Sequence, residues 1–518
     1  MEAQMPTPSN KSNNGLTQRI VYPAFNGGLN LSVPPESIEL NELREAINVE
    51  YSPKTGSMRV RGGIKMSFPF NEYSPDFLAQ ISPYHFLIAQ KKILEGVCRF
   101  YLFSIHPYPA TNGYFDIIDL GDISLREFSE IDDMYGLMVD TDDILISLGK
   151  HLWRYGLAKH YNQDRDQYFW GDSPELYEVP SAYMRSSMIF LHNDRVGLVH
   201  EKNVIRVSRL GDYLDWFEDT DDASATQYTE VGYKDNLYIS AVMPLSQDLI
   251  VFKYKENVSD GRIYRLVGRV PDWSVVEVAH HTSTFSQNSV QVVGNDVFFL
   301  DHTGLNALSN VQSYGDVKLS PPDKKVNNVL SREIDSSSRL WNLRLRQQLW
   351  ILPSQDSEYI WVFDYVRNIW TKFRFSIQNI MAISEGYDTK RSNVVDVYIV
   401  THDGLYVLDD DTIVDTIVLK ETYMGKEYQS TKTRQIEAYM KLGTLATGRQ
   451  TLIKNVYASH NIPEGCSGEL ILGKFKMPFK GSHSRRQCLV RDWTIEPEIK
   501  MYGGGCSVST LGLEMVEV

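Results

Sequence analysis

The sequence has few of the features that mark export, membrane insertion or metal binding. None of its apolar runs reaches the roughly 18 residues that span a membrane, and residues 1–18 lack the apolar stretch of a signal peptide. The cysteines form no CxxC pair and lie beside no His cluster, which argues against a zinc site. Reduced thiols in a packed sheet are therefore favoured over a disulfide among Cys466, Cys488 and Cys506.

Sequence motifs of catalysis are also missing. The chain has no GxSxG, no phosphate-binding loop, no HExxH and no GxGxxG ahead of a helix. The Ser-x-Asp-x-Gly-x-Thr-Trp boxes of propeller sialidases are absent too. His280, His281 and His483 stand near no repeated acid or nucleophile, and a lone His is more often a satisfied structural residue. We therefore expect no enzyme activity, no catalytic residues, no cofactor and no metal.

Negative charge is in excess but unevenly spread. The formal net charge is −14. Residues 427–518 hold 12 Lys and Arg against 9 Asp and Glu, which leaves 40 against 57 in residues 1–426, so the two parts carry +3 and −17. An acidic body does not bind nucleic acid by neutralising phosphates. It either repels DNA mildly or simply keeps the protein soluble.

A repeat of about 50 residues runs through the chain. Short apolar runs begin at Asp143, Asp194, Asp248, Asp296, Gln348 and Asp396, with an earlier copy near His85. Each is followed by a turn and a second strand, as in Gly304–Leu308 and Gly404–Leu408, and this order is typical of a hairpin. A hairpin that recurs at this period indicates the blades of a β-propeller. Seven copies predict six or seven blades; unrelated hairpins in two sandwiches are the alternative.

The patterns divide the chain into four parts and predict a mainly β fold. We expect a flexible N-terminal arm (1–21), a leader with a Gly-Gly turn and a short helix (22–75), a β-propeller-like platform (76–430) and a C-terminal β-sandwich (431–518). The helix is predicted over Asn41–Asn48, where Asn41 can cap and Leu43, Ala46 and Ile47 form an apolar stripe. The sandwich strands are expected at Arg434–Lys441, Lys454–Ser459, Glu469–Lys474, Cys488–Glu496 and Ser507–Glu517.

Acidic clusters lie at the ends of three predicted strands. They comprise Asp140, Asp142 and Asp143; Asp219, Asp221 and Asp222; and Asp409, Asp410 and Asp411. Turn geometry favours Asp at such positions. None of the clusters has the alternating ligands and distal Glu of a calcium loop. We interpret them as turn and surface residues.

A segment near the N-terminus carries a family resemblance. It reads Phe25-Asn-Gly-Gly-Leu-Asn30, continues through Glu42 and Asn48-Val49, and ends Arg59-Val-Arg-Gly-Gly63. In this order it resembles the N-terminus of tail tube or nozzle proteins (tail hub, packaged-DNA stabilisation) of short-tailed, podovirus-type bacteriophages. Residues 204–216 and 295–305 resemble later segments of the same group, so the resemblance extends from about residue 22 to the end of the chain.

The resemblance implies a structural virion protein. Such proteins form an oligomeric ring, commonly a homohexamer, below the portal and its adaptor, and this ring conducts and retains DNA. The implied partners are further copies, the adaptor or head-to-tail connector protein, and tail fibres or spikes, while DNA passes through the channel without specific binding. The implied location is the phage tail, and the host cytoplasm before assembly.

Because the resemblance implies a DNA channel, two of the acidic turns are candidate lumen-facing sites. Inward-pointing carboxylates would keep DNA from adhering. The candidates are Asp140, Asp142, Asp143, Asp219, Asp221 and Asp222. The alternatives to a tail protein are a non-catalytic protein-interaction propeller and a glycan-acting propeller hydrolase.

Overall fold

The chain folds almost entirely into β-sheet. The computed structural model describes residues 17–110, 113–124, 134–140, 143–148, 151–162, 167–179, 186–200, 202–216, 222, 224–255, 260–270, 272–311, 316–320, 324–387, 395–410, 412–423 and 426–517. Within these ranges the one α-helix is α1 (Asn327–Leu330). No helix in the described part of the chain is long and apolar enough to cross a bilayer.

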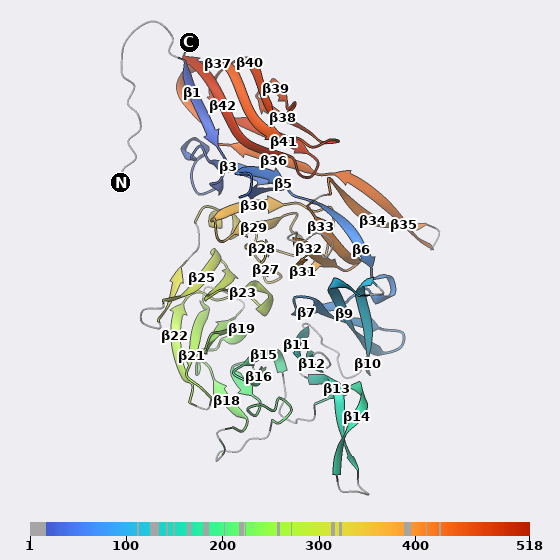
Figure 1. Cartoon of the computed structure of the whole chain (residues 1–518). Helices are drawn as coiled ribbons and strands as arrows, with labels where there is room; N and C mark the ends of the chain where they lie inside the picture. The colour runs from blue at the N-terminus through green and yellow to red at the C-terminus, as the bar shows by residue number, and fades with distance from the viewer. Residues whose placement is uncertain are drawn as a thin grey trace.

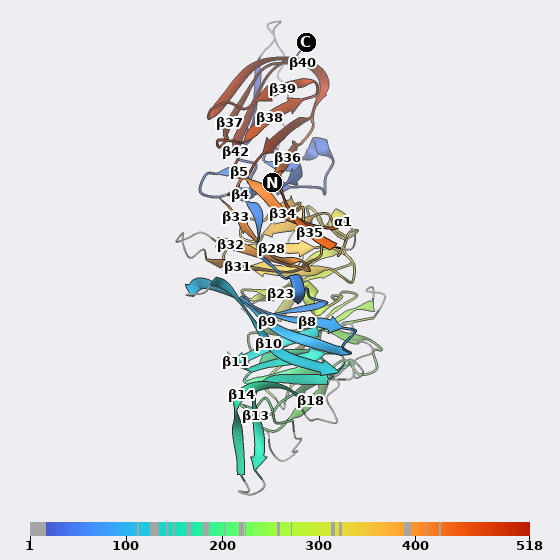
Figure 2. The same ribbon diagram turned by 90° about the vertical axis from the view of Figure 1, so that its right-hand side faces the viewer.

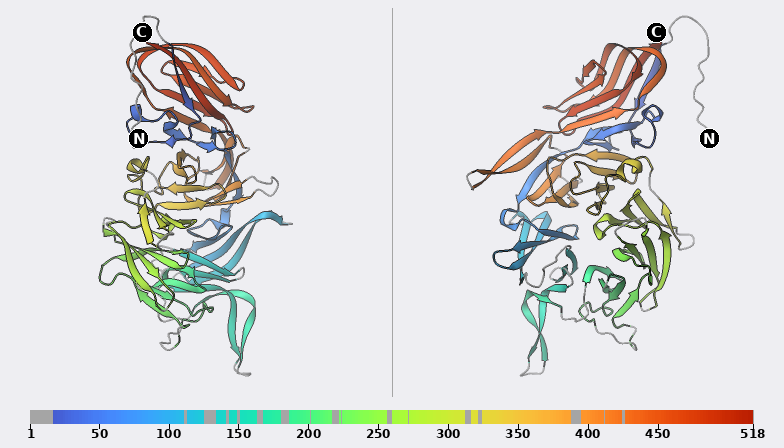
Figure 3. Two further views of the ribbon diagram at one scale, coloured as in Figure 1. Left: turned by 60° about the vertical axis from the view of Figure 1, so that its left-hand side comes forward. Right: turned by 180° about the vertical axis from the view of Figure 1, so that it is seen from behind.

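A closed ring of antiparallel sheets forms the larger part of the molecule (Figures 1 and 3). Six sheets are each built from four consecutive strands, and the innermost strands of neighbouring sheets contact one another around the ring. The ring is therefore a β-propeller, as predicted. Its strands are β7 (Phe77–Ser82), β8 (His85–Lys92), β9 (Val97–Ala110) and β10 (Gly113–Ser124); β11 (Met134–Asp140), β12 (Asp143–Leu148), β13 (His151–Asn162) and β14 (Gln167–Glu178); β15 (Ser186–His192), β16 (Arg195–His200), β17 (Val204–Val207) and β18 (Gln227–Glu230); β19 (Tyr238–Leu245), β20 (Asp248–Tyr254), β21 (Arg262–Val267) and β22 (Ser274–His280); β23 (Val290–Val293), β24 (Asp296–Asp301), β25 (Gly304–Val311) and β26 (Asp316–Ser320); and β27 (Arg339–Leu343), β28 (Gln348–Leu352), β29 (Ile360–Asp364) and β30 (Ile369–Phe373).

A seventh sheet completes the ring and is closed by a strand from the N-terminal part of the chain. It contains β31 (Ile380–Tyr387), β32 (Val395–Thr401), β33 (Gly404–Asp409) and β6 (Gly63–Pro69). The pairing of β6 with β33 is antiparallel, with Ile64 opposite Leu408. On its other side β6 runs parallel to β34 (Val414–Tyr423), which forms a projecting hairpin with β35 (Lys426–Gln435) (Figure 1).

The apolar run of the sequence repeat is the second strand of each sheet: β8, β12, β16, β20, β24, β28 and β32. These strands are buried on both faces because each sheet packs between two others. In β12, Ile144 and Ile146 join the core shared with the preceding sheet, whereas Leu145 joins the core shared with the next one. Burial of both faces explains why the repeat reads as a continuous apolar run rather than an alternation.

The C-terminal part forms a β-sandwich on one side of the ring, and the molecule is elongated as a result (Figures 1 and 2). Met440 and Ile499 of one sheet and Val456 and Leu513 of the other share one core, which confirms the predicted sandwich. All four cysteines are free thiols. One sheet contains β3 (Glu42–Ile47), β36 (Glu437–Leu442), β41 (Pro497–Tyr502), β38 (Ser467–Leu472) and β39 (Phe475–Pro478), with β2 (Gly28–Leu29) beside β3; the other contains β4 (Val49–Ser52), β5 (Ser57–Val60), β42 (Ser507–Glu517), β37 (Leu445–Asn461) and β40 (His483–Ile495), with β1 (Gln18–Pro23) beside β42.

Strand β3 joins the two parts of the molecule. Ile47 of β3 pairs in parallel with Lys372 of β30, and the same strand pairs with β36 of the sandwich. One sheet therefore runs from the blade β27–β30 through β3 into the sandwich.

The predicted helix over Asn41–Asn48 is wrong, because Glu42–Ile47 within it form strand β3. A β-bulge between Leu43 and Glu45 gives the strand one extra residue opposite β36. Leu43 and Ala46 consequently become buried at a spacing of three, which imitates the spacing of a helix. The predicted Gly-Gly turn is present, and Gly28 adopts a φ of 64° there.

Candidate functional site

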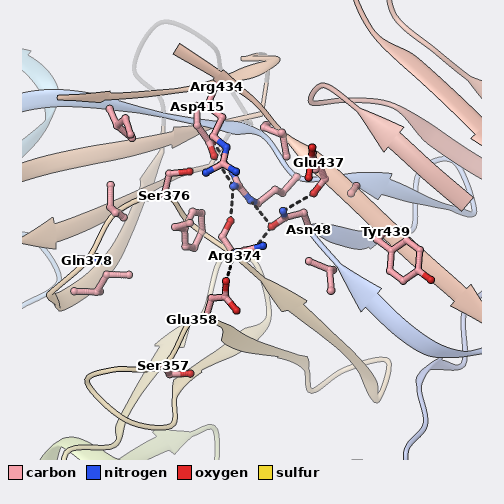
Figure 4. Close-up of a pocket in the computed structure, with 18 of the residues that line it drawn as sticks. Asn48, Ser357, Glu358, Arg374, Ser376, Gln378, Asp415, Arg434, Glu437 and Tyr439 are labelled. Atoms are coloured by element: carbon pink, nitrogen blue, oxygen red, sulfur yellow. Dashed lines mark hydrogen bonds and ion pairs between the residues drawn. The ribbon is translucent and has the colours of Figure 1, made fainter. Parts of the chain in front are cut away.

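A cavity of about 900 Å³ lies where the propeller meets the sandwich (Figure 4). Its walls come from the β28–β29 turn, the segment after β30, the strands β34 to β36 and the leader. Residues of the N-terminal leader, the last blades and the sandwich therefore meet around it.

Arg61 is the central buried charge of this junction, with only 1% of its surface exposed. Its guanidinium group donates to both carboxylate oxygens of Asp415, at 2.9 and 2.8 Å. It also donates to the backbone carbonyls of Gly62 and Arg374, both at 2.8 Å, and lies over the ring of Phe375 at 4.5 Å. A bidentate pair with further acceptors is the arrangement in which a buried guanidinium is well satisfied.

Asn48 connects the leader, the propeller and the sandwich through one side chain (Figure 4). Its Oδ1 accepts from Arg61 Nε at 3.0 Å and from the backbone N–H of Arg374 at 2.8 Å. Its Nδ2 donates to the carbonyl of Glu437 at 2.7 Å, and its backbone N–H donates to the carbonyl of Lys372. Its φ of 57° is a conformation that Asn tolerates better than most residues.

A second ion-pair cluster joins the leader strands to the propeller. Glu50 accepts from Arg59 at 2.9 Å and pairs with Arg346 at 2.8 Å, and Arg59 also pairs with Asp410 at 2.7 Å. Burial alone would raise the pKa of Glu50, but the guanidinium groups of Arg346 and Arg59 outweigh burial and lower the pKa to about 2. The Glu50 carboxylate therefore stays ionised inside the protein.

Gly62 lets the leader pass very close to the end of β33. A Cβ atom at Gly62 would lie 2.2 Å from the carbonyl oxygen of Asp409, which is closer than any real side chain allows. The residue after Arg61 therefore has to be glycine for the backbone to take this path.

The chemistry available at this junction is that of structural ion pairs. Arg61 and Asp415 satisfy one another, and Arg374 pairs with Glu358 at the cavity wall. Among the described residues no group of three His, Cys, Asp or Glu could hold a metal ion. The polar groups of the leader are used to hold two parts of the fold together.

The predicted lumen-facing turns are only partly described by the structure. Asp142, Asp219 and Asp221 lie outside the described residues. Asp140 ends β11 and is exposed. Asp222 is half-buried, pairs with Arg209 and accepts from Ser224, whose hydrogen bonds lower the pKa of its carboxyl group. Whether Asp140 and Asp222 face a channel stays a prediction.

Asp143 differs from the surface residue expected at a turn. It is buried at the start of β12, where Arg154 Nε donates to its Oδ1 at 2.7 Å and Tyr213 also donates to its carboxylate. Its charge is neutralised inside the propeller, so it presents no negative charge at the surface. The sequence pattern around Asp143 did not predict that Arg154 on the next strand would be its partner.

The fold and the junction together define a β-propeller fastened to a β-sandwich by its N-terminal leader. No known family model matches the chain, and no curated protein matches its sequence. Among solved structures, the N-terminal domain of Nup159 is similar over 67% of this chain and 94% of its own, at 12% identity and a TM-score of 0.36. Hsv2 of Kluyveromyces lactis is similar over 70% and 96%, at 10% identity and a TM-score of 0.35. An exo-β-1,3-galactanase from Phanerochaete chrysosporium is similar over 87% and 100%, at 8% identity and a TM-score of 0.28.

Proposed function

We propose that this protein is a non-catalytic structural subunit, in which a propeller and a sandwich are held as one unit for use in a larger protein assembly. The observation that carries this proposal is the role of the leader. The hydrogen bonds and ion pairs of its polar residues Asn48, Arg59 and Arg61 join the two parts of the fold. A catalytic group needs atoms left open to a substrate.

The type of assembly follows from the sequence resemblance. The same leader residues resemble those of tail tube or nozzle proteins of short-tailed phages, and we propose that the chain is such a subunit, built into a ring below the portal and its adaptor. Two features support this assignment. A subunit that conducts DNA needs a fixed shape, which the junction supplies, and the net charge of −14 disfavours adhesion of DNA to it.

Negative-stain imaging of the purified chain, alone and after mixing with tail-less phage heads from its source, tests this function. Rings with a channel wide enough for duplex DNA, or added density below the portal of the heads, are the expected result. Compact particles that never join a ring or a head would reject the tail assignment. Such particles would favour a protein-interaction propeller of another kind.

A screen for hydrolysis of glycans tests the enzyme alternative. Turnover that survives repeated purification and is lost on substitution of a residue in the central opening of the propeller would reject the non-catalytic assignment. Cleavage that copurifies with the preparation but is unchanged by such substitutions would be due to a contaminant.

A further inference from the structure

Strand β40 is a long edge strand of the sandwich. In the described part of the chain it pairs with β37 alone, and β39 of the facing sheet packs near it without a backbone ladder. An edge strand presents unpaired backbone groups, which makes it a template for a strand of another chain. Natural proteins exploit such edges for recognition by strand addition.

The exposed side chains of β40 are mostly basic or apolar. Leu489 and Trp493 are 69% and 59% exposed, although both are large hydrophobic residues. Arg485 and Arg491 are exposed on the same strand, and Asp492 is its one acidic residue. Exposed aromatic and arginine side chains together are enriched at contact surfaces between proteins.

Arg485 is already ordered by a neighbour on the sheet. Its guanidinium lies 4.9 Å from the ring of Tyr457, and that of Arg19 lies 5.3 Å from the same ring. Glu514 of β42, the strand on the other side of β37, is the acidic group nearby, and a hydrogen bond from Tyr457 lowers the pKa of its carboxyl group. An arginine that is already ordered loses less side-chain entropy on binding.

Strand β10 is an edge strand of opposite character on the propeller. Among the residues that the structure describes it pairs only with β9, and its sequence holds three aspartates and no Lys or Arg. Asp116, Asp119 and Asp122 are exposed, and so is Ile118, at 45%. Asp119 pairs with Arg99 of β9 at 2.7 Å.

The neighbouring strand β14 extends this acidic rim. It packs against β10 and adds the exposed residues Glu175 and Glu178. His151 contacts Glu178 at 2.7 Å. The rim therefore combines an open backbone edge, an exposed isoleucine and an excess of negative charge.

We propose that β40 of one copy adds to the edge of β10 of a second copy. The two edges are complementary in charge, each carries exposed apolar residues, and they have 13 and 12 residues. Within one copy they lie far apart, β40 in the sandwich and β10 on the propeller (Figures 1 and 2). The formal charge of the chain is divided in the same way, with +3 in residues 427–518 and −17 in residues 1–426.

The geometry of this contact has a consequence for symmetry. Because the two edges are different surfaces, the contact is head-to-tail and leaves a free β40 and a free β10 on the pair. Head-to-tail contacts close into rings or continue as open filaments, according to the rotation between copies. The inference thus rests on the proposed function and names the surface through which the subunits join.

Sedimentation velocity of the full chain across a concentration series tests this contact. The wild-type protein is expected to associate at low ionic strength and to associate less at about 0.5 M salt, because exposed charges are screened. Replacement of Arg485 and Arg491 by Glu is expected to raise the apparent Kd at least about tenfold. Lys474→Glu with Lys480→Glu, two exposed positions in the same domain, is the matched control and should leave the Kd unchanged.

A charge swap tests whether β10 is the partner edge. Asp116→Lys with Asp122→Lys should weaken association as much as the arginine reversal, and the four changes combined in one chain should restore it. Circular dichroism and thermal unfolding of each variant establish that it is folded. Failure of a folded four-fold variant to associate would reject β10 as the partner.

Two experimental outcomes would overturn this contact without overturning the proposed function. Rings or head-bound density that persist in the Arg485→Glu, Arg491→Glu variant would keep the structural role and overturn this contact. A wild-type protein that stays monomeric at every concentration and salt would overturn the second copy as the occupant of β40. In that case density added to phage heads would still support the tail function.

Discussion

At the scale of single residues, the leader is held by two buried charges whose partners are far away in the sequence. Arg61 and Asp415 are 354 positions apart, and Glu50 pairs with Arg346. The Arg-x-Arg pattern could be noticed in the sequence, but its acidic partners could not be identified. Pairing between distant residues depends on ring closure, which no local pattern encodes.

Replacement of Arg61 should lower the free energy of unfolding, because it leaves a buried carboxylate without its partner. We expect Arg61→Met to lower the free energy of unfolding by about 3–5 kcal/mol, because Asp415 would remain buried without its partner. Urea unfolding measures the change. Arg209→Met, which breaks only partly exposed pairs, should cost no more than about 1 kcal/mol. Equal stability of Arg61→Met and wild type would contradict the role assigned to Arg61.

Glu50 should make the protein sensitive to acid in a defined range. Its pKa in the folded protein is about 2 and its ordinary value is 4.5, so its stabilising contribution is complete above pH 4.5 and is lost as the pH falls towards 2. A loss on the order of 3 kcal/mol is expected across this range. Glu50→Gln lacks this titration, and its unfolding free energy should fall less steeply over the same pH values. Parallel pH profiles for the two proteins would exclude an ionised Glu50.

At the scale of elements, the sequence pattern correctly predicted the repeated strands of the blades, but it predicted a helix where the bulged strand β3 lies. The central residues of the second strands are buried on both faces, so their apolar runs are strong and regular signals. In β3 the bulge places Leu43 and Ala46 three positions apart on one face, and a period of three or four residues is read as a helix. The pairing of β6 with β33 was equally hidden, because it joins opposite ends of the propeller sequence.

Strand β6 should be essential for keeping the ring closed. Lys65 is exposed, but its backbone lies between β33 and β34, opposite Val407 and Thr416. Proline at this position removes a backbone donor in the middle of a sheet. We expect Lys65→Pro to lower the free energy of unfolding on the order of 3 kcal/mol, and Lys65→Ala to change it by less than about 0.5 kcal/mol. Chemical unfolding followed by circular dichroism measures both, and a Pro variant as stable as the Ala variant would show that β6 is dispensable.

At the scale of the whole molecule, the propeller and the sandwich should unfold together. The sheet that runs from β27 to β39 through β3 belongs to both parts, and the leader's ion pairs cross the same junction. We therefore expect a single calorimetric transition whose van't Hoff and calorimetric enthalpies agree. Two resolved transitions, or a sandwich that melts while the propeller stays folded, would contradict a shared unit.

The pairing of the first strands with the last has a consequence during synthesis on the ribosome. Strand β6 pairs with β33 and β1 pairs with β42, so both early strands leave the ribosome long before their partner strands are synthesised. At about 5–20 residues per second this interval is on the order of tens of seconds. A chain whose translation stops before β42 keeps an unclosed sandwich with exposed apolar strands, and proteases and chaperones recognise such surfaces. Synthesis of β42 is therefore required before the sandwich can close, so that only chains that contain β42 are expected to become subunits ready for assembly.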